Sequence, residues 1–569
     1  MFCKLIVPTL DDVKYRVIKP CILFVFVLII AVPKLAISAD LLSRSLQSED
    51  IFNLEYATDP RISPDGERVV YTRMSMDIMT DGRKSSLWTV NANGDDHRSL
   101  IPGKGNYTSP RWSPNGDRLA YLYAEEGSPQ IYVRRMDTGD TVNLGNFSQP
   151  PGDITWSPDG KSIAFTMQIT CDKRPSFGTL PVKPEGAKWA EPFHVIDKPI
   201  YRINGEGYLP CGYKHIFLVS SEGGTPRQLS SGDFHHTGPL SFSPDGKQIY
   251  FDANRNADSE LYPFTFFKKD VYVLSVVTGE TRQLTDHKGP NQMPSVSPDG
   301  NFIAYVGHEN LSIGFQNDRL YVMNKDGSDK RVLTANFDVS VSNPQWTTDG
   351  DGIYFQYAER GNAKLGYVDV SGGNVREVAS GLSGWGPMFP LTAHPTVTFS
   401  AKGSYATTFG TPSRPSEVGV GRMGWAPKQV TTLNEDVLGD KKLATMSELT
   451  WASSVDGRKI HGWLATPSDF DPSKKYPLWL EIHGGPYGSW GPYFSTLVQR
   501  ATAEGYVVLL PNQRGSTSYG EEFSQLIHLD YPGKDHEDYM SGIDALIAMG
   551  FVDEDQLFMT GLSAGGIAT

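Results

Sequence analysis

Short alternating runs of hydrophobic and polar residues fill the chain between residues 40 and 440. Apolar and aromatic triplets recur, such as Val69-Val70-Tyr71, Leu119-Ala120-Tyr121 and Ile249-Tyr250-Phe251. A second short run follows each of them, as at Asp270-Val271-Tyr272-Val273. Runs of this length, rich in β-branched and aromatic residues and separated by glycine turns, favour strands over helices. The pattern predicts repeated antiparallel meanders of about four strands.

A tetrapeptide turn precedes these strands and repeats along the chain. It reads Ser-Pro-Asp-Gly or Ser-Pro-Asn-Gly at residues 63–66, 113–116, 157–160, 243–246 and 297–300, with a degenerate Thr-Thr-Asp-Gly at 347–350. Proline presets φ, aspartate or asparagine bonds its own backbone, and glycine accepts the left-handed conformation, so each copy is a tight hairpin turn.

The spacing of the turns indicates the architecture. Successive copies lie 50, 44, 86, 54 and 50 residues apart, so one unit carries an insertion, at about residues 167–212, and the others have the length of a propeller blade. With a degenerate last unit at residues 396–433, the repeat predicts a seven-bladed β-propeller over residues 40–440; six or eight blades are the alternatives. Propellers of this kind are often binding modules, so this half alone does not define a function.

After residue 440 the pattern changes to strands that alternate with helices, which is typical of a parallel sheet with crossover connections. It predicts strands at 449–454, 459–466, 476–482, 506–511 and 556–560, the last of them buried, and helices at 495–504 and 534–549. Residues 441–569 are therefore predicted to form the N-terminal half of an α/β-hydrolase domain.

The last predicted strand runs into Gly561-Leu562-Ser563-Ala564-Gly565. This is a G-x-S-x-G motif with the strand before it and the helix after it that a nucleophile elbow requires. Such a sharp turn presents the Ser563 hydroxyl as a nucleophile and places the Ala564 N–H beside it as an oxyanion donor. The motif in this context predicts acyl transfer through Ser563.

A second motif, His483-Gly484-Gly485-Pro486, follows an apolar strand. The loop at this place in an α/β-hydrolase donates the second oxyanion N–H, which we assign to Gly484 or Gly485. His483 is predicted to order this loop rather than to act as the base, because the triad of this fold runs in the order serine, acid, histidine.

A serine hydroxyl needs a histidine to take its proton and an acid to orient that histidine. All twelve histidines precede Ser563, whereas this fold places the acid and the base after the serine. We therefore expect residues 1–569 to lack the catalytic acid and base, to be inactive as they stand, and to leave the hydrolase sheet incomplete with an exposed edge.

Four stretches carry a resemblance to a known family: residues 483–486, 512–520, 533–538 and 561–566. With the insertion segment 201–208 and residues 212–219, they make the chain similar to the prolyl oligopeptidase family, in particular its acylaminoacyl peptidase and dipeptidyl peptidase branch. The resemblance implies hydrolysis of short peptides through an acyl-enzyme on Ser563, with the propeller excluding folded proteins. It also implies structural roles for Arg514 and Asp538.

Two other functions stay open from the sequence. The same serine and oxyanion loop would serve an esterase or another acyl hydrolase, although simple esterases of this fold usually lack a propeller. A propeller binding module that carries an inactive hydrolase remnant is the alternative outside enzymes. No cofactor and no metal are predicted; peptides are the expected partners, and a homo-oligomer remains open.

Charge and the N-terminal segment bear on partners and location. The formal net charge of −13 offers no basic field for nucleic acid.

The N-terminal segment has four basic residues followed by an apolar run of twelve, Cys21 to Val32. This run is too short to span a membrane, so it predicts a signal peptide over residues 1–39, with an uncleaved anchor as the alternative. We expect an exported protein, periplasmic or extracellular, that contacts a membrane only if this segment is retained.

Cysteine usage agrees with export. Cys171 and Cys211 are the two cysteines beyond the N-terminal segment. An even pair in an exported chain predicts one disulfide, and two free buried thiols are the alternative.

Overall fold

The computed structural model describes residues 45–171, 181–190, 196, 199–205, 207–255, 268–309, 313–384, 388–392 and 395–569. The predicted signal peptide or anchor at residues 1–39 lies outside these ranges, as do parts of the predicted insertion. Within the ranges, no helix has both the length and the apolar character needed to cross a membrane.

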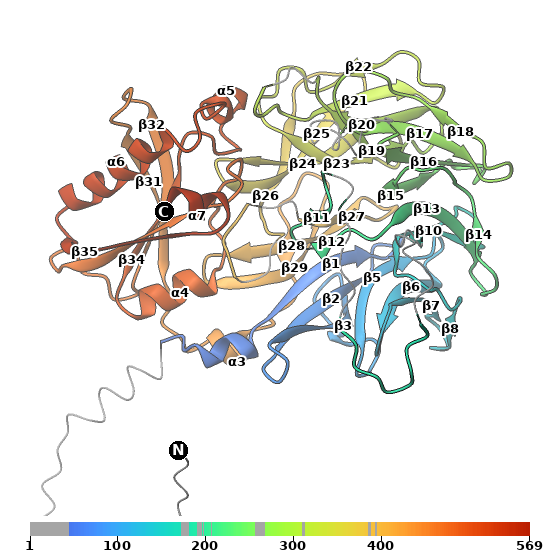
Figure 1. Ribbon diagram of the computed structural model, residues 1–569, viewed down its shortest axis with the longest axis horizontal. Coiled ribbons are helices and arrows are strands. Elements are labelled where there is room, and N and C mark those ends of the chain that lie inside the picture. Colours follow the sequence, from blue (N-terminus) through green and yellow to red (C-terminus); the bar gives the residue numbers. More distant parts are fainter. Residues whose placement is uncertain are drawn as a thin grey trace, which may run out of the picture. The chain divides into compact units, whose positions relative to one another are not determined.

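Antiparallel sheets of four strands follow one another from residue 55 to residue 332 (Figure 1). The first two are β1 (Glu55–Ile62), β2 (Arg68–Asp77), β3 (Gly82–Asn91) and β4 (Arg98–Ser99), then β5 (Asn106–Trp112), β6 (Arg118–Ala124), β7 (Gln130–Arg135) and β8 (Thr141–Asn143). The third is β9 (Pro151–Trp156), β10 (Ser162–Thr170), β13 (Gly212–Ser220) and β14 (Arg227–Gln228). The fourth and fifth are β15 (His236–Phe242), β16 (Gln248–Ala253), β17 (Asp270–Ser275) and β18 (Thr281–Gln283), then β19 (Asn291–Val296), β20 (Phe302–Gly307), β21 (Arg319–Asn324) and β22 (Arg331–Val332).

The last sheet of this region has eight strands and contains two further meanders. They are β23 (Val341–Trp346), β24 (Gly352–Glu359), β25 (Asn362–Asp369) and β26 (Arg376–Leu382), then β27 (Val397–Phe399), β28 (Ser404–Thr411), β29 (Arg414–Arg422) and β30 (Lys428–Gln429). A single residue pair, Leu382 with Phe409, joins the two meanders. In the third sheet the connection from β10 to β13 carries the insertion, which holds the small hairpin of β11 (Arg202–Ile203) and β12 (Gly207–Tyr208).

The repeated turn adopts the predicted hairpin conformation. At the first copy, the Ser63 hydroxyl donates to the Asp65 carboxylate and accepts from the Arg68 N–H at 3.0 Å, and Gly66 has φ +77°. The hydrogen bond from Ser63 lowers the pKa of Asp65. The degenerate copy keeps the geometry, because the Thr347 hydroxyl replaces serine and donates to Asp349 at 2.6 Å.

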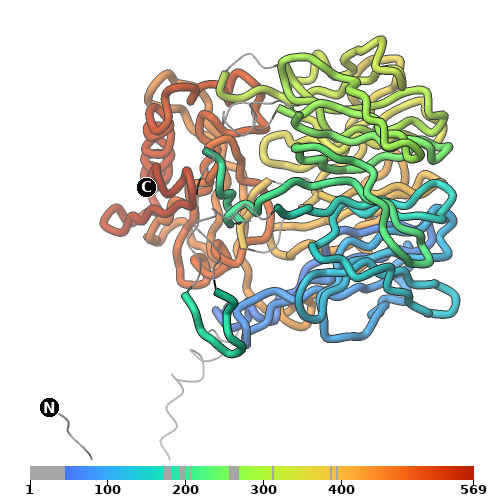
Figure 2. Tube along the Cα trace, turned by 45° about the vertical axis from the view of Figure 1, so that its right-hand side comes forward, coloured from blue at the N-terminus to red at the C-terminus, as the bar shows by residue number. Residues whose placement is uncertain are grey.

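Successive sheets pack face to face in a closed series. Apolar side chains of each sheet form a core with those of the next, for example Val70 and Leu87 with Leu119 in the first pair. The last meander packs back on the first sheet, where Ala406 and Val418 meet Ala57. Figure 2 follows this course along the Cα trace, from the blue first sheet to the orange last one. The sheets therefore form a ring.

Tryptophan side chains at the ends of the first strands link neighbouring sheets. Trp112 Nε1–H donates to the Arg61 carbonyl and Trp156 Nε1–H to the Arg111 carbonyl, each at 2.9 Å. At the closure of the ring the Thr398 hydroxyl takes this place: it donates to the Pro60 carbonyl at 3.1 Å. The carbonyl two residues before the turn serine thus joins the first sheet to the second and the second to the third, whereas the closure uses the carbonyl one residue earlier.

A mixed sheet that is not part of the ring follows it in sequence, with strand order β31-β32-β34-β33-β35. It contains β31 (Thr445–Ala452), β32 (Lys459–Thr466), β33 (Tyr476–Ile482), β34 (Val507–Asn512) and β35 (Val552–Gly561). The helical elements of the described residues are η1 (Glu49–Asn53), α3 (Glu435–Leu438), α4 (Thr496–Ala503), α5 (Glu521–Gln525), α6 (Asp535–Ala548) and α7 (Ala564–Ala568). Strands β34 and β35 each pair parallel with β33, as crossover connections require.

Helices α4 and α6 cover opposite faces of this sheet (Figure 1). Neighbouring residues of a strand point to opposite faces: Leu509 packs in the core with Ile543 of α6, and Val508 packs in the core with Val498 of α4. The sequence predicted these strands and helices to within a few residues, but its prediction of a buried strand at 556–560 was wrong. Strand β35 is the last in the sheet order, and Leu557 and Phe558 are exposed.

Candidate active site

Ser563 lies at the tip of a strained turn between β35 and α7. Its φ is +59° and its ψ is −119°, a conformation that a residue other than glycine rarely adopts. The flanking glycines make the turn possible: a Cβ at Gly561 would come within 2.3 Å of the Gly565 carbonyl carbon, and one at Gly565 within 2.2 Å of the Ile482 carbonyl oxygen. The backbone therefore exposes the Ser563 side chain, as a nucleophile elbow does.

The loop after β33 lies against this turn. A Cβ on Gly484 would be 3.3 Å from Ser563 Cβ and 2.9 Å from the Leu562 carbonyl oxygen, so the backbone at Gly484 closely approaches the nucleophile. Within the described part of the chain, the N–H groups of Gly484 and Gly485 have no hydrogen-bond acceptor. The structure thus brings the predicted loop and the predicted nucleophile together.

Ala564 is the first residue of α7 and is buried. An N–H in the first turn of a helix has no intrahelical partner, so it can donate to an oxyanion formed beside Ser563. The Tyr531 hydroxyl donates to the Ala564 carbonyl and fixes the start of the helix. Tyr531 was not singled out from the sequence, because nothing in its local pattern shows what its hydroxyl reaches.

His483 is buried and both ring nitrogens are occupied. Nδ1 lies 2.8 Å from the Gly484 carbonyl oxygen and Nε2 lies 2.9 Å from the Ser516 hydroxyl oxygen. Because a carbonyl can only accept, Nδ1–H donates to it and Nε2 accepts from Ser516. Burial lowers the pKa of His483 to about 4, so the ring is neutral at neutral pH. The side chain orders the loop that holds Gly484, the role predicted for it.

No histidine within the described ranges hydrogen-bonds the Ser563 hydroxyl. These residues also contain no group of three or more histidine, cysteine, aspartate or glutamate side chains with metal-binding geometry. The chemistry that the described site contains is a strained serine with backbone N–H donors beside it.

Residues from the ring region contact the segment that follows the Gly484 loop, through one side chain and through the backbone. Phe315, between β20 and β21, lies against the Tyr487 ring with 5.5 Å between the ring centroids. Trp490 forms a β-bridge with Leu391, and the Gly491 N–H donates to the Pro390 carbonyl at 2.8 Å. The ring therefore braces the oxyanion loop from outside the hydrolase sheet, a relation that strand patterns do not reveal.

Arg514 and Asp538 form a buried ion pair in the hydrolase domain. Nε and Nη2 of Arg514 each donate at 2.9 Å to a different Asp538 carboxylate oxygen, and the Arg514 backbone N–H adds a third bond at 2.9 Å. The pair anchors the loop after β34 to helix α6. This geometry agrees with the structural role inferred from the sequence.

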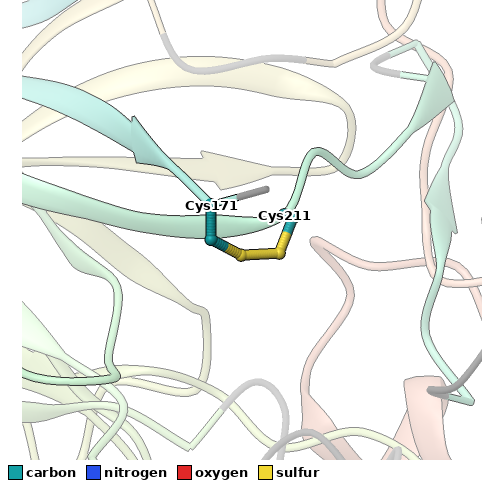
Figure 3. Close-up of a disulfide and its surroundings, with 2 residues drawn as sticks. All are labelled: Cys171 and Cys211. Atoms are coloured by element: carbon teal, nitrogen blue, oxygen red, sulfur yellow. A yellow bond between two sulfur atoms is a disulfide. The ribbon is translucent and has the colours of Figure 1, made fainter. Parts of the chain in front are cut away.

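A disulfide between Cys171 and Cys211 closes the base of the insertion (Figure 3). The Cα atoms are 5.3 Å apart, and the bond joins the ends of β10 and β13 across 40 residues. Among the described residues of the insertion, Trp189, Tyr201 and Tyr208 are exposed.

Comparisons with known proteins agree with this geometry. Residues 492–569 match the family described as "Prolyl oligopeptidase family", and residues 206–265 match "Dipeptidyl peptidase IV (DPP IV) N-terminal region". The chain is 28% identical over 557 residues to the uncharacterized peptidase YuxL of Bacillus subtilis, covering 93% of this chain and 80% of the relative. It is 26% identical over 542 residues to dipeptidyl-peptidase 5 of Porphyromonas gingivalis, covering 92% and 76%.

A solved structure extends the likeness to the fold. Pyrococcus horikoshii acylaminoacyl peptidase superposes with a TM-score of 0.73 at 20% sequence identity, covering 92% of this chain and 76% of that protein. Its architecture is a propeller followed by a hydrolase domain, so the predicted combination of these two folds is confirmed.

Proposed function

Because this chain belongs to the prolyl oligopeptidase family of serine peptidases, we propose that it removes short units from the ends of small peptides through an acyl-enzyme on Ser563. Relatives named dipeptidyl-peptidase and acylaminoacyl peptidase support this substrate class. In the first step the Ser563 oxygen attacks the scissile carbonyl, and the amine leaves with a proton. Water then attacks the ester, which releases the acid and restores the serine.

The observation that carries the proposal is the close approach of Gly484 to Ser563. An oxyanion formed at the attacked carbonyl would lie between the N–H of Ala564 and that of Gly484 or Gly485. Preorganised donors of this kind contribute most when the charge develops in the transition state, by about 10²–10³ in rate for each donor.

The proposal also covers the propeller, the access of substrates and the location of the protein. We infer that the seven four-stranded meanders are the blades of one propeller, which restricts entry to small peptides. We also infer that the protein acts outside the cytoplasm, since a disulfide across β10 and β13 favours an oxidising compartment. Detection of the protein only in cytoplasmic fractions would contradict this location.

We propose, in addition, that residues 1–569 alone do not activate Ser563. Both ring nitrogens of His483 are already occupied, so this nearby histidine cannot accept the serine proton. This predicts weak or absent reaction of the 569-residue chain with serine-directed reagents.

Labelling with a fluorophosphonate probe tests the function directly. We expect the intact gene product to be labelled on one serine, identified as Ser563 by mass spectrometry, and the Ser563→Ala variant to stay unlabelled. Ser541→Ala, at a half-buried serine of α6, is the matched control and should be labelled like the parent. A folded, unlabelled gene product would reject the enzyme and favour a propeller binding module.

Substrate comparison separates the peptidase from an esterase. The intact gene product should cleave dipeptidyl and N-acylaminoacyl amides of a chromogenic amine. Hydrolysis of the matching esters together with inert amides would assign the site to ester hydrolysis instead.

A further inference from the structure

A cavity of about 560 Å³ lies inside the ring of sheets and is lined by their first strands. It is separate from the elbow, because its lining residues belong to strands and loops between residues 61 and 397. The cavity wall carries two arginines, Arg61 and Arg111, and one carboxylate, Asp153, whose Oδ2 accepts a hydrogen bond from Thr166 at 2.8 Å.

Both arginines occupy the same position of the repeat, two residues before the first residue of the tight turn. The equivalent residues of four other sheets also line the cavity, and they are Thr155, Ser241, Ser295 and Gln345. The ring therefore presents two adjacent guanidinium groups, three hydroxyls and an amide at one level. None of these six side chains is acidic, and the two guanidinium groups share a single carboxylate, Asp59, so one positive charge is left over at this level to attract a negatively charged guest.

The backbone fixes the two arginines. Asp59 and Ser109, each two residues earlier, have left-handed φ values of +48° and +54° at irregularities of strand pairing. The carbonyls of Arg61 and Arg111 accept the tryptophan hydrogen bonds from the next sheets. The backbone of both arginines is therefore held in place, so less conformational entropy is lost when their side chains become ordered on binding.

One carboxylate, Asp59, holds both guanidiniums. Arg61 Nε donates to its Oδ1 at 2.7 Å, and Arg111 Nη1 donates to its Oδ2 at 2.8 Å. Arg61 Nη1 and Arg111 Nη2 have no hydrogen-bond partner among the described residues. The pKa of Arg61 falls to about 10, first because burial disfavours its charge and then because Arg111 repels it, and it stays charged at neutral pH.

We propose that Arg61 and Arg111 together bind a carboxylate group of a peptide inside the propeller. This rests on the proposed function only for the choice of a peptide as the source of the carboxylate. Two adjacent guanidinium groups match the two oxygens of a carboxylate, and such charge-assisted pairs are stronger than neutral hydrogen bonds. At the same level the Thr155 hydroxyl, which donates to the Asp153 carbonyl, can accept from a peptide N–H. The Ser241 hydroxyl, which accepts from the Val296 N–H, can donate to a peptide carbonyl.

Binding without turnover tests the proposal. The probe is a short peptide with an N-terminal fluorophore, prepared once with a free terminal carboxylate and once as the carboxamide. Anisotropy is measured with the Ser563→Ala variant, so failure of this site and failure of catalysis are distinguishable. We expect the carboxylate form to bind about ten- to hundredfold more tightly, as charge-assisted hydrogen bonds imply.

Arg61→Gln and Arg111→Gln should each remove most of this preference, whereas Arg111→Lys should keep part of it because the charge remains. Arg98→Gln, an exposed arginine of β4, is the matched control and should retain the full preference. Thermal unfolding verifies that the variants fold. Equal binding of the two peptide forms, or an unchanged preference in the folded glutamine variants, would overturn the proposal. Acetate competing as well as the peptide would overturn the peptide source and assign the arginines to small free carboxylates.

Discussion

Replacing Asp538 by asparagine should destabilise the hydrolase domain strongly. The carboxylate accepts three hydrogen bonds from Arg514, one of them from the backbone, and it is fully buried, while the Arg514 side chain is 3% exposed. An asparagine of the same shape would turn an NH₂ group toward these donors and leave the guanidinium buried without its counter-charge. Breaking one partner of a buried ion pair costs about 3–5 kcal/mol, and we expect a loss in that range.

Asp456 provides a matched control on the same arginine. It lies 3.4 Å from Arg514 Nη2, but its side chain is 37% exposed. Exposed pairs contribute about 0–1 kcal/mol, so Asp456→Asn should change stability little. The double variant Arg514→Met with Asp538→Leu should recover much of the loss, because no unpaired charge remains buried.

Urea unfolding followed by tryptophan fluorescence measures these free energies. Because a protein of two domains can unfold in steps, hydrogen exchange of the α6 amides should assign the weakened transition to the hydrolase domain. A cost below about 1 kcal/mol for Asp538→Asn, or an equal cost for Asp456→Asn at the exposed carboxylate, would contradict a stabilising buried ion pair.

Three further outcomes follow from the geometry. The folded-state pKa of His483 is about 4, below the ordinary value of histidine, so between these two pH values the unfolded state binds more protons than the folded state. The free energy of unfolding should therefore fall as pH drops through this window, and it should fall less steeply in His483→Gln. Equal pH slopes of the two proteins in a thermal unfolding series would contradict this. In the intact gene product, Gly565→Ala should abolish probe labelling because its Cβ would meet a carbonyl oxygen at 2.2 Å. Gly566→Ala, whose Cβ would be 3.2 Å from a carbonyl oxygen, should retain more labelling in the same gel assay. Reducing the Cys171–Cys211 bond should lower the free energy of unfolding by up to about 4 kcal/mol, which is the entropy of closing a 40-residue loop. It should also speed trypsin cleavage within the insertion, and unchanged cleavage would show that the bond does not restrain this segment.

Local chemistry explains what the sequence could predict. The tight turns were predictable because serine, proline, aspartate and glycine each act on their own backbone within a few residues, as the hydrogen bonds of Ser63 and Asp65 illustrate. The elbow was predictable for the same reason, since Gly561 and Gly565 are required by contacts close to Ser563.

Features that depend on distant neighbours were not predictable. An exposed edge of this sheet was predicted, but the apolar sequence of β35 was still taken to mean covered side chains. Whether Leu557 and Phe558 are covered depends on elements that pack over the two faces of the sheet, which the strand's own sequence does not reveal. The contact of Phe315 with Tyr487 joins residues far apart in the chain. The adjacent arginines did leave a signal, the repeated Pro-Arg before the turn at Arg61 and Arg111, but it becomes meaningful only once the strands are arranged in a ring.

The closure of the ring has a consequence for biosynthesis. All strands of the first sheet come from residues 55–99 and all those of the last meander from residues 397–429, so side-chain packing and a few hydrogen bonds close the ring without a shared sheet. The bond between Ile62 and Thr398 spans 336 residues, whereas the other sheets meet partners that are adjacent in sequence. During synthesis from the N-terminus, the face of the first sheet that packs on the last meander therefore stays uncovered until residues 397–429 emerge, which leaves this apolar surface open to aggregation for longer than the contacts between sheets adjacent in sequence.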